Sequence, residues 1–264
     1  MQRTLYLIER GNRINLHADG PSLLITSRNK AARRIPVNAI DKVVVIGNIR
    51  IDADSITLCA DNNIPLLFIS QGNTEKAFIL PYNHKLPRHY KEQRIIIQSE
   101  DTQRRYRKWI QTRKTMMQMQ ILREIFKKFR LPDEIGEGNY QFIINKIGQR
   151  YATWSMIKDI VENFIRAIIL GRILNAGLDP HFGIINRRVN FGLLLDLSLI
   201  FEPEADLQTI KFFQSNSVKI ENNELSESNI KSIIDRFESR RESIFQLAET
   251  VIDEFFEIMK DLRK

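Results

Sequence analysis

The stretch that decides the fold of this 264-residue chain is LNAGLDPHFGIINRRVNFGLLLDLSLIFEPEAD, Leu174 to Asp206. Apolar residues at helical spacing lead into it. Gly177 followed by Asp179-Pro180 predicts the end of that helix, because proline cannot continue it. The apolar run Phe191 to Phe201 that follows contains one carboxylate, Asp196. Burying an ionised carboxylate is costly unless it is paired or binds a cation, so Asp196 is a candidate site residue.

This stretch is similar to a motif of the CRISPR-associated spacer integrases, the metal-dependent DNA endonucleases of the adaptation module. The shared pattern runs through GLDP, the Gly-Ile-Ile after it, Leu195-Asp196-Leu197, Phe201, Pro203 and Asp206. Three positions depart from it: Asn186 stands at the family's histidine ligand, Leu199 at an acidic ligand and Glu202 at an arginine. The resemblance therefore implies a divergent member with a degraded catalytic motif.

The resemblance also implies a metal site. Glu137, in a Glu-Gly-Asn helix start, matches the family's first metal ligand, so the family-equivalent catalytic positions are Glu137, Asn186 and Asp196. Mg²⁺ or Mn²⁺ would be held by Glu137 and Asp196 if any of the site survives, and otherwise the chain has no cofactor. Asparagine adds no charge, leucine cannot coordinate, and losing one carboxylate removes on the order of several kcal/mol of attraction for the ion. An inactive protein is therefore favoured.

Three functions stay open at this point. The first is an integrase-like DNA-binding protein with weak or no catalytic activity. The second is an active metal-dependent DNA endonuclease or integrase with a rearranged site, in which Glu202 substitutes for the missing acid. The third is a purely structural subunit, whose weak affinity for DNA would not respond to charge reversal.

Positive charge is concentrated in the first part of the chain, which has a formal net charge of +8. Residues 1–150 carry 26 basic and 14 acidic side chains, whereas residues 151–264 carry 14 and 18. Such asymmetry favours a polyanionic partner, and nucleic acid is the usual one. The candidate DNA-binding residues are Arg104, Arg105, Arg107, Lys108, Lys127, Arg187 and Arg188. Arg113 and Lys114 are placed in the same basic row, which could equally be the solvated side of a helix.

The predicted fold class is α+β with two domains. β-prone segments predict a β-sandwich-like domain over 1–85, prolines and histidines indicate a linker over 86–100, and helical periodicity predicts an all-α DNA-binding or catalytic-type domain over 101–264. In the first domain the β-branched run 42–46 predicts a central strand. Gly11-Asn12 predicts a hairpin turn, and 54–60 a short helix with an N-capping acid. By resemblance, this domain pairs with its copy in a two-fold dimer.

Helical spacing organises the second half. It predicts a long helix over 101–130 and two further helices over 226–240 and 243–262. A polar loop is expected over 216–224, before the first of these two helices. The apolar stripe of the long helix consists of Trp109, Met116, Met117, Ile121, Ile125 and Phe129. A stripe at this spacing is more often core than a cofactor site.

Composition limits the remaining choices. The single cysteine, Cys59, excludes a disulfide framework and predicts a buried residue on a helix. The N-terminus carries charge too early for a signal peptide, so we expect a cytoplasmic protein that does not enter a membrane. The expected partners are double-stranded or branched DNA and a second copy of the chain. The resemblance adds a small second adaptation subunit and a role in antiviral defence.

Overall fold

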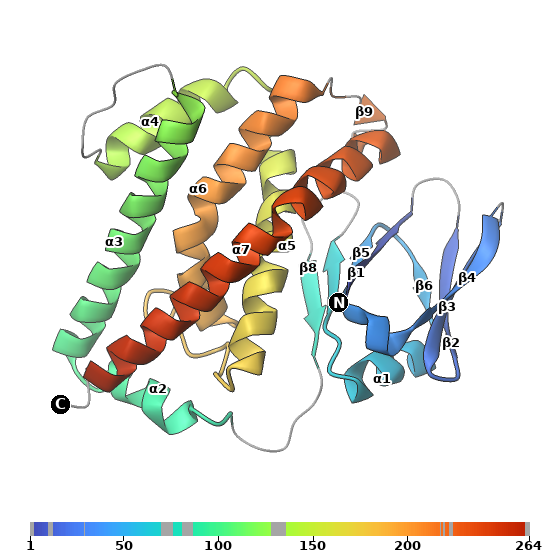
Figure 1. The fold of residues 1–264 in the computed structure, drawn as a ribbon, viewed down its shortest axis with the longest axis horizontal. Coiled ribbons are helices and arrows are strands. Elements are labelled where there is room, and N and C mark those ends of the chain that lie inside the picture. Colours follow the sequence, from blue (N-terminus) through green and yellow to red (C-terminus); the bar gives the residue numbers. More distant parts are fainter. Residues whose placement is uncertain are drawn as a thin grey trace. The chain divides into compact units, whose positions relative to one another are not determined.

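The computed structural model describes residues 3–9, 13–28, 30–69, 76–80, 87–127, 136–216, 218, 220–221 and 224–261. The chain divides into two compact units, residues 1–84 with 218–231, and residues 85–217 with 232–264. Several predicted features lie outside the described residues: the Gly11-Asn12 turn, the end of the helix predicted to reach residue 130, and Phe129 of its apolar stripe. Figure 1 shows the order of the elements along the chain.

The first unit contains two four-stranded sheets, together with a short helix and a two-stranded pair that are described below. One has the order β1 (Arg3–Ile8), β5 (Ile40–Ile46), β7 (Leu66–Ile69), β8 (Lys76–Ile79). The other has the order β4 (Lys30–Pro36), β3 (Ser22–Ser27), β2 (Ile14–Asp19), β6 (Arg50–Ile51). Leu16 and Leu23 from the second sheet share one buried cluster with Val43 and Leu66 from the first. Side chains of both sheets thus form a common core, as in a sandwich.

Strand β5 is the central strand that its β-branched sequence predicted. It pairs in parallel with both β1 and β7. Val43, Val44, Val45 and Ile46 are each no more than 1% exposed, because both faces of the strand are covered.

Helix α1 (Ala53–Asp61) begins one residue before its predicted start, and its N-cap is Asp52. The Asp52 carboxylate accepts a hydrogen bond of 2.7 Å from the backbone N–H of Ser55, whereas Asp54 lies inside the first turn. Cys59 is buried in this helix, as expected.

The second unit is helical. Its helices are α2 (Tyr90–Ile97), α3 (Glu100–Ile125), α4 (Glu137–Gly148), α5 (Trp154–Asn175), α6 (Gly192–Ser215) and most of α7 (Glu227–Asp261). Helix α6 packs against both α3 and α5 and lies between them (Figure 1). The fold class predicted from the sequence, a β-rich domain followed by a helical region, is confirmed.

Three predicted details need correction. The linker expected over 86–100 contains α2, because its residue Gln93 is buried and bonds through its amide to the backbone of Asp179. The two helices expected at 226–240 and 243–262 are one continuous α7, since buried Phe237 and Ile244 continue one apolar face across the expected break. The loop expected over 216–224 contains β9 (Ile220–Glu221), which pairs with β10 (Glu224–Leu225).

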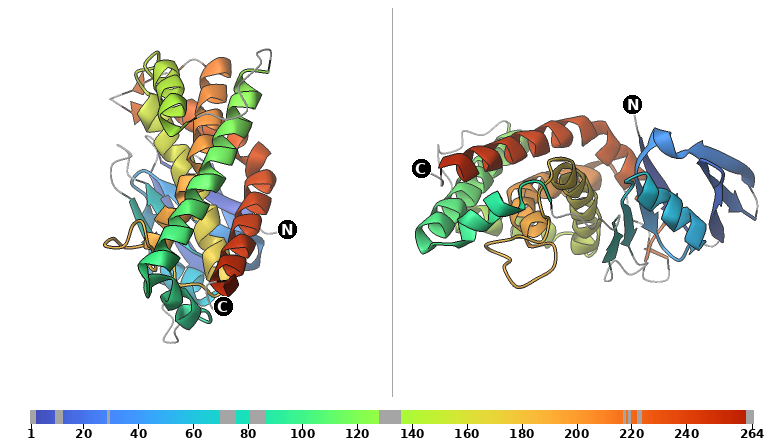
Figure 2. Two further views of the ribbon diagram at one scale, coloured as in Figure 1. Left: turned by 90° about the vertical axis from the view of Figure 1, so that its left-hand side faces the viewer. Right: turned by 90° about the horizontal axis from the view of Figure 1, so that it is seen from below.

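The apolar stripe of α3 is also partly corrected. Met117 and Ile121 are buried, but Met116 is 56% exposed. The loop between α5 and α6 is visible in Figure 2 as a gold trace that projects from the helices. Among the described residues, no helix combines the length and the apolar character needed to span a bilayer.

Replacing Asp52 by alanine should lower the free energy of unfolding by about 1 kcal/mol, because the first turn of α1 loses its acceptor. The hydrogen bond from Ser55 holds the pKa of Asp52 below its ordinary value of 3.8. The contribution is therefore present above that value and is lost as the pH falls through the lowered pKa. Urea denaturation at neutral and acidic pH measures both effects. Asp54→Ala is the matched control, and an equal loss in both variants would contradict the assignment of the cap.

Candidate functional site

Asp196, near the start of α6, is fully buried and satisfied by hydrogen bonds. Its Oδ2 accepts from the backbone N–H of Ile184 (2.6 Å) and Ile185 (3.0 Å) and from the Tyr106 hydroxyl (3.3 Å). Its Oδ1 accepts from the backbone N–H (2.8 Å) and the side-chain amide (2.9 Å) of Asn186. Five donors occupy the lone pairs of both oxygens, so in this arrangement the carboxylate anchors the loop and offers little to a metal ion.

The loop that Asp196 anchors is also closed tightly at its base. A Cβ atom on Gly183 would lie 2.4 Å from the carbonyl carbon of Gly192, so neither position tolerates a side chain without movement. Phe191 adopts a left-handed conformation (φ 60°) immediately before the first residue of α6. The sequence of the loop therefore fixes the position of Asn186 relative to α6.

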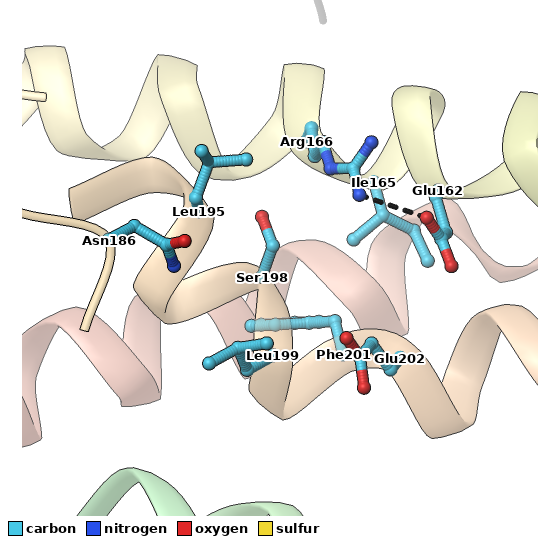
Figure 3. Close-up of a pocket in the computed structure, with 9 residues that line it drawn as sticks. All are labelled: Glu162, Ile165, Arg166, Asn186, Leu195, Ser198, Leu199, Phe201 and Glu202. Carbon is cyan, nitrogen blue, oxygen red and sulfur yellow. Dashed lines mark hydrogen bonds and ion pairs between the residues drawn. The ribbon is translucent and has the colours of Figure 1, made fainter. Parts of the chain in front are cut away.

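A pocket of about 110 Å³ lies beside this loop (Figure 3). Its lining comes from α5, α6 and the loop, and consists of Glu162, Ile165, Arg166, Asn186, Leu195, Ser198, Leu199, Phe201 and Glu202. Asn186, Leu199 and Glu202, the three positions predicted from the resemblance to depart from the integrase motif, thus line a single pocket.

Lys114 of α3 links Glu202, which lines the pocket, to Glu137 at the start of α4. Its ammonium group lies 3.1 Å from Glu137 Oε1 and 2.7 Å from Glu202 Oε2. The side chain is 13% exposed. Burial lowers the pKa of Lys114, but the hydrogen bonds and charges of Glu202 and Glu137 outweigh burial and raise the pKa above its ordinary value. Lys114 is therefore a cation at neutral pH.

Glu137 is held by more than this ion pair. Its carboxylate also accepts hydrogen bonds from the amides of Gln118 (2.6 Å) and Gln141 (3.2 Å). Burial raises the pKa of Glu137, but these amides and Lys114 together lower it below its ordinary value. The carboxylate is thus ionised and has several donors around it.

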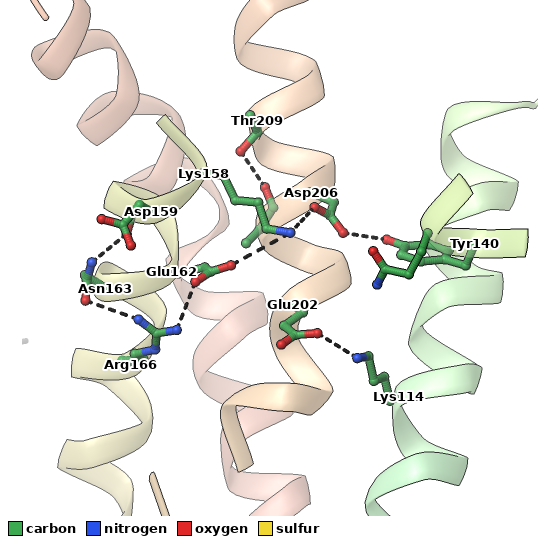
Figure 4. Close-up of polar contacts among 12 residues, drawn as sticks. Lys114, Tyr140, Lys158, Asp159, Glu162, Asn163, Arg166, Glu202, Asp206 and Thr209 are labelled. Carbon is green, nitrogen blue, oxygen red and sulfur yellow. Dashed lines mark hydrogen bonds and ion pairs between the residues drawn. The ribbon is translucent and has the colours of Figure 1, made fainter. Parts of the chain in front are cut away.

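A second ion-pair group extends from α5 to α6 (Figure 4). Lys158 lies 2.6 Å from Asp206 Oδ1 and 3.8 Å from Glu162 Oε1, and Arg166 lies 2.9 Å from Glu162 Oε2. The Tyr140 hydroxyl donates to Asp206 Oδ2 at 3.0 Å. Burial raises the pKa of Asp206, and Lys158 and Tyr140 only partly oppose it. Asp206 and Glu162 are therefore each paired with a lysine or arginine of the protein.

The residues that the resemblance assigns to the family's metal site do not fit a divalent cation. Mg²⁺ and Mn²⁺ need several oxygen ligands, but Leu199 has none and the Asn186 amide donates to Asp196. Glu137 and Glu202 are already bonded to an ammonium group. Within the described ranges, no three His, Cys, Asp or Glu side chains are grouped as metal ligands would be. The two predicted metal ligands, Glu137 and Asp196, bind different partners. Gln118, Gln141 and Lys114 contact the Glu137 carboxylate, whereas Tyr106 and the loop before α6 donate to the Asp196 carboxylate.

The predicted DNA-binding residues are all on the surface. Arg104, Arg105, Arg107, Lys108 and Lys127 are exposed along α3 and just after it, and Arg187 and Arg188 are exposed on the anchored loop. The rest of the predicted basic row is corrected: Arg113 pairs with Glu254 at 3.0 Å, and Lys114 turns toward the acids described above. These two residues lie on the side of α3 that packs in the bundle.

Comparison with known proteins identifies the family. A family model described as "CRISPR associated protein Cas1" matches residues 5–153, more than half of the chain. The chain belongs to the Cas1 family. No curated protein sequence matches this Cas1 chain at a significant level.

Solved structures share the fold of this Cas1 chain at low sequence identity. TM1797, a Cas1 protein from Thermotoga maritima, has a TM-score of 0.78 at 15% identity, over 98% of this chain and 97% of that one. A chain of a Cas6-RT-Cas1–Cas2 complex has a TM-score of 0.69 at 10% identity, over 97% and 35%. A chain of a TtCas1–DNA complex has a TM-score of 0.62 at 11% identity, over 97% and 91%.

Sequence reasoning missed most of the ion-pair partners. Lys158, Glu162 and Arg166 are spaced by one helical turn each, which is the signal that could have shown the charged ladder on α5. Lys114 and Gln118, also one turn apart, could have been assigned to an inward face of α3 in the same way.

Replacing Asp196 by alanine should lower the free energy of unfolding by about 3 kcal/mol or more, because three backbone N–H groups and the Tyr106 hydroxyl lose their acceptor. Urea denaturation followed by circular dichroism measures the loss. Asp235→Ala, an exposed aspartate on α7, is the matched control and should change stability by no more than about 0.5 kcal/mol. Equal stability of the two variants would show that Asp196 does not hold the loop.

Proposed function

We propose that this Cas1 family member acts in CRISPR adaptation as a DNA-binding protein with weak or no cleavage or integration activity. The observation that carries the proposal is the ammonium group of Lys114 between Glu137 and Glu202. Asn186 and Leu199, at the family's ligand positions, support it because they supply neither charge nor enough coordinating atoms. The family's reaction requires a metal ion, Mg²⁺ or Mn²⁺, that polarises a phosphoryl group, and this donor set does not fit one.

DNA binding is proposed on the exposed basic residues of α3 and the loop. Arg105 and Lys108 are exposed on α3, and Arg187 and Arg188 on the loop anchored by Asp196. Each phosphate that such a residue neutralises releases counterions, which supplies most of the affinity in non-specific binding. The solved Cas1–DNA complex of similar fold supports a DNA partner, which we propose to be double-stranded or branched.

The proposed assembly is a homodimer formed through the β-rich residues 1–85, together with a small second adaptation subunit. A Cas1 chain of similar fold occurs in a complex with Cas2, which supports the second subunit. We place this assembly in the cytoplasm, in antiviral defence.

One observation favours the second candidate, an active enzyme with a rearranged site. Glu137 and Glu202 contact the same ammonium group and are therefore close enough to share a cation. This enzyme could bind a metal ion only after Lys114 had moved away from both carboxylates. The contacts with these carboxylates raise the pKa of Lys114, so the lysine stays charged and attracted to them. The inactive protein is therefore the better supported candidate.

The purified 264-residue chain, incubated with Mn²⁺ and a branched DNA, should give no cleavage above that of a Glu137→Gln variant. A deficit of about 4 kcal/mol in the activation free energy already slows a reaction roughly a thousandfold. Denaturing electrophoresis of end-labelled strands measures the products. Cleavage by the wild-type chain that Glu137→Gln abolishes would favour the rearranged enzyme instead.

The double variant Arg105→Gln, Lys108→Gln should bind duplex DNA more weakly and with less dependence on salt. Each lost phosphate contact lowers the slope of log affinity against log salt concentration by about 0.9. Fluorescence anisotropy over a range of salt concentrations measures the slope. The control removes the same charge from α7, at the exposed Lys231 and Lys260. A slope that falls equally in both double variants would argue against the α3 surface.

A further inference from the structure

We propose that Lys114 is a built-in replacement for the divalent cation of this fold, and that its removal turns Glu137 and Glu202 into a divalent-cation site. The ammonium group belongs to α3, Glu137 to the first turn of α4, and Glu202 to α6. One cation thus joins three helices at the place where the family motif predicts a metal. The inference rests on the proposed function only in taking the site to be metal-free in the wild-type chain.

The geometry around Lys114 is that of a cation site with its cation in place. Two carboxylate oxygens, Glu137 Oε1 and Glu202 Oε2, lie at 3.1 and 2.7 Å from the ammonium nitrogen. The contact to Glu202 has the length of a charge-assisted hydrogen bond, and the contact to Glu137 is slightly longer. The Lys114 side chain is largely covered, while Glu137 and Glu202 keep 36% and 31% of their side-chain surface exposed. The carboxylates are therefore accessible to an ion from solution, whereas the lysine is held between them.

The charge balance points the same way. Glu137, Glu162, Glu202 and Asp206 carry four negative charges, and Lys114, Lys158 and Arg166 pair with them through three positive charges. A divalent ion added to this nearly neutral group would gain little attraction and would meet the ammonium group at contact distance. Two unit charges about 4 Å apart near a protein surface repel strongly enough to weaken binding on the order of a thousandfold.

Removal of Lys114 reverses this balance. Without the ammonium group, Glu137 and Glu202 face each other with no shared cation and repel. A hard divalent ion with oxygen ligands would relieve that repulsion, and water can complete its coordination because both carboxylates are partly exposed. The other cations of the region, Lys158 and Arg166, are bonded to Asp206 and Glu162 and do not contact Glu137.

The test compares the wild-type chain with Lys114→Gln in thermal denaturation with and without Mn²⁺, supported by electron paramagnetic resonance of free Mn²⁺. The wild-type Tm should not change with Mn²⁺. The Tm of Lys114→Gln should rise by several degrees, because an ion that binds only the folded state stabilises it, and one equivalent of Mn²⁺ signal should be lost. Lys114→Arg keeps the charge and should behave as the wild type.

Two controls locate the new site. Lys114→Gln combined with Glu202→Gln should lose the response to Mn²⁺, because one carboxylate of the pair is neutral. Lys211→Gln removes a lysine that pairs with the carboxylate of Glu124 at another position in the bundle, and it should gain no response. If Lys114→Gln does not fold, Lys114→Met carries the same measurement, since it also removes the charge while filling the space.

Two outcomes would overturn the inference. One is a Tm rise of the wild-type chain with Mn²⁺ that Glu137→Gln abolishes, because the ammonium group would then not exclude the metal. The other is a folded Lys114→Gln or Lys114→Met that shows no response to Mn²⁺. The second outcome leaves the proposed function intact if the wild-type chain binds DNA without cleaving it, so the two failures are distinguishable.

Discussion

The helical unit depends on one constraint: acidic side chains of α6 are buried in a helix that neighbours cover on nearly every side. Asp196, Glu204 and Asp206 are each no more than 2% exposed. A buried carboxylate without partners costs far more than the marginal stability of a domain allows. Each acid therefore takes its partners from a different part of the chain, and these partners determine which helices must meet α6.

The partners account for much of the arrangement of the bundle. Asp196 accepts hydrogen bonds from Tyr106 of α3 and from the loop before α6. Asp206 pairs with Lys158 of α5 and accepts a hydrogen bond from Tyr140 of α4. Glu204 accepts two hydrogen bonds, of 2.7 and 2.9 Å, from the guanidinium of Arg240 on α7. Such a bidentate pair adds direction as well as energy. The acids of α6 thus fix the helices around it in one register, and hydrophobic contacts fill the space between.

The sequence predicted the fold further than it predicted the site. The β-branched run 42–46 and the helical periodicities depend on local spacing, which a single sequence contains. Asp196 was recognisable because a lone acid in an apolar run needs a partner, but its donors come from position 106 and from backbone groups that only the folded loop brings together. The sequence alone thus shows that Asp196 needs hydrogen-bond donors, but it does not show which groups supply them.

Lys114 illustrates a second limit of prediction from sequence, which concerns polar residues that face the inside of the bundle. Helix α3 carries basic residues on all sides, so spacing alone could not separate the row that faces solvent from the residues that face α4 and α6. The predicted apolar stripe included Met116, which is exposed, and left out Gln118, which is fully buried and donates from its side-chain amide to Glu137. Inward-facing lysine and glutamine side chains give no hydrophobic signal in the sequence, because charge and hydrogen bonding hold them in place.

The proposed retention of this fold without a metal ion follows from the same electrostatics. In a metal-binding protein the ion holds together acids that would otherwise repel, so losing the ion leaves the carboxylates uncompensated. Here Glu137 and Glu202 remain close because a lysine on a third helix neutralises both. A lysine ammonium group is covalently attached to the chain and needs no octahedral set of ligands. Binding of a metal ion depends instead on the free ion concentration and on the number of ligands. In the proposed arrangement, a cation held by the chain replaces one taken from solution and keeps the three helices together.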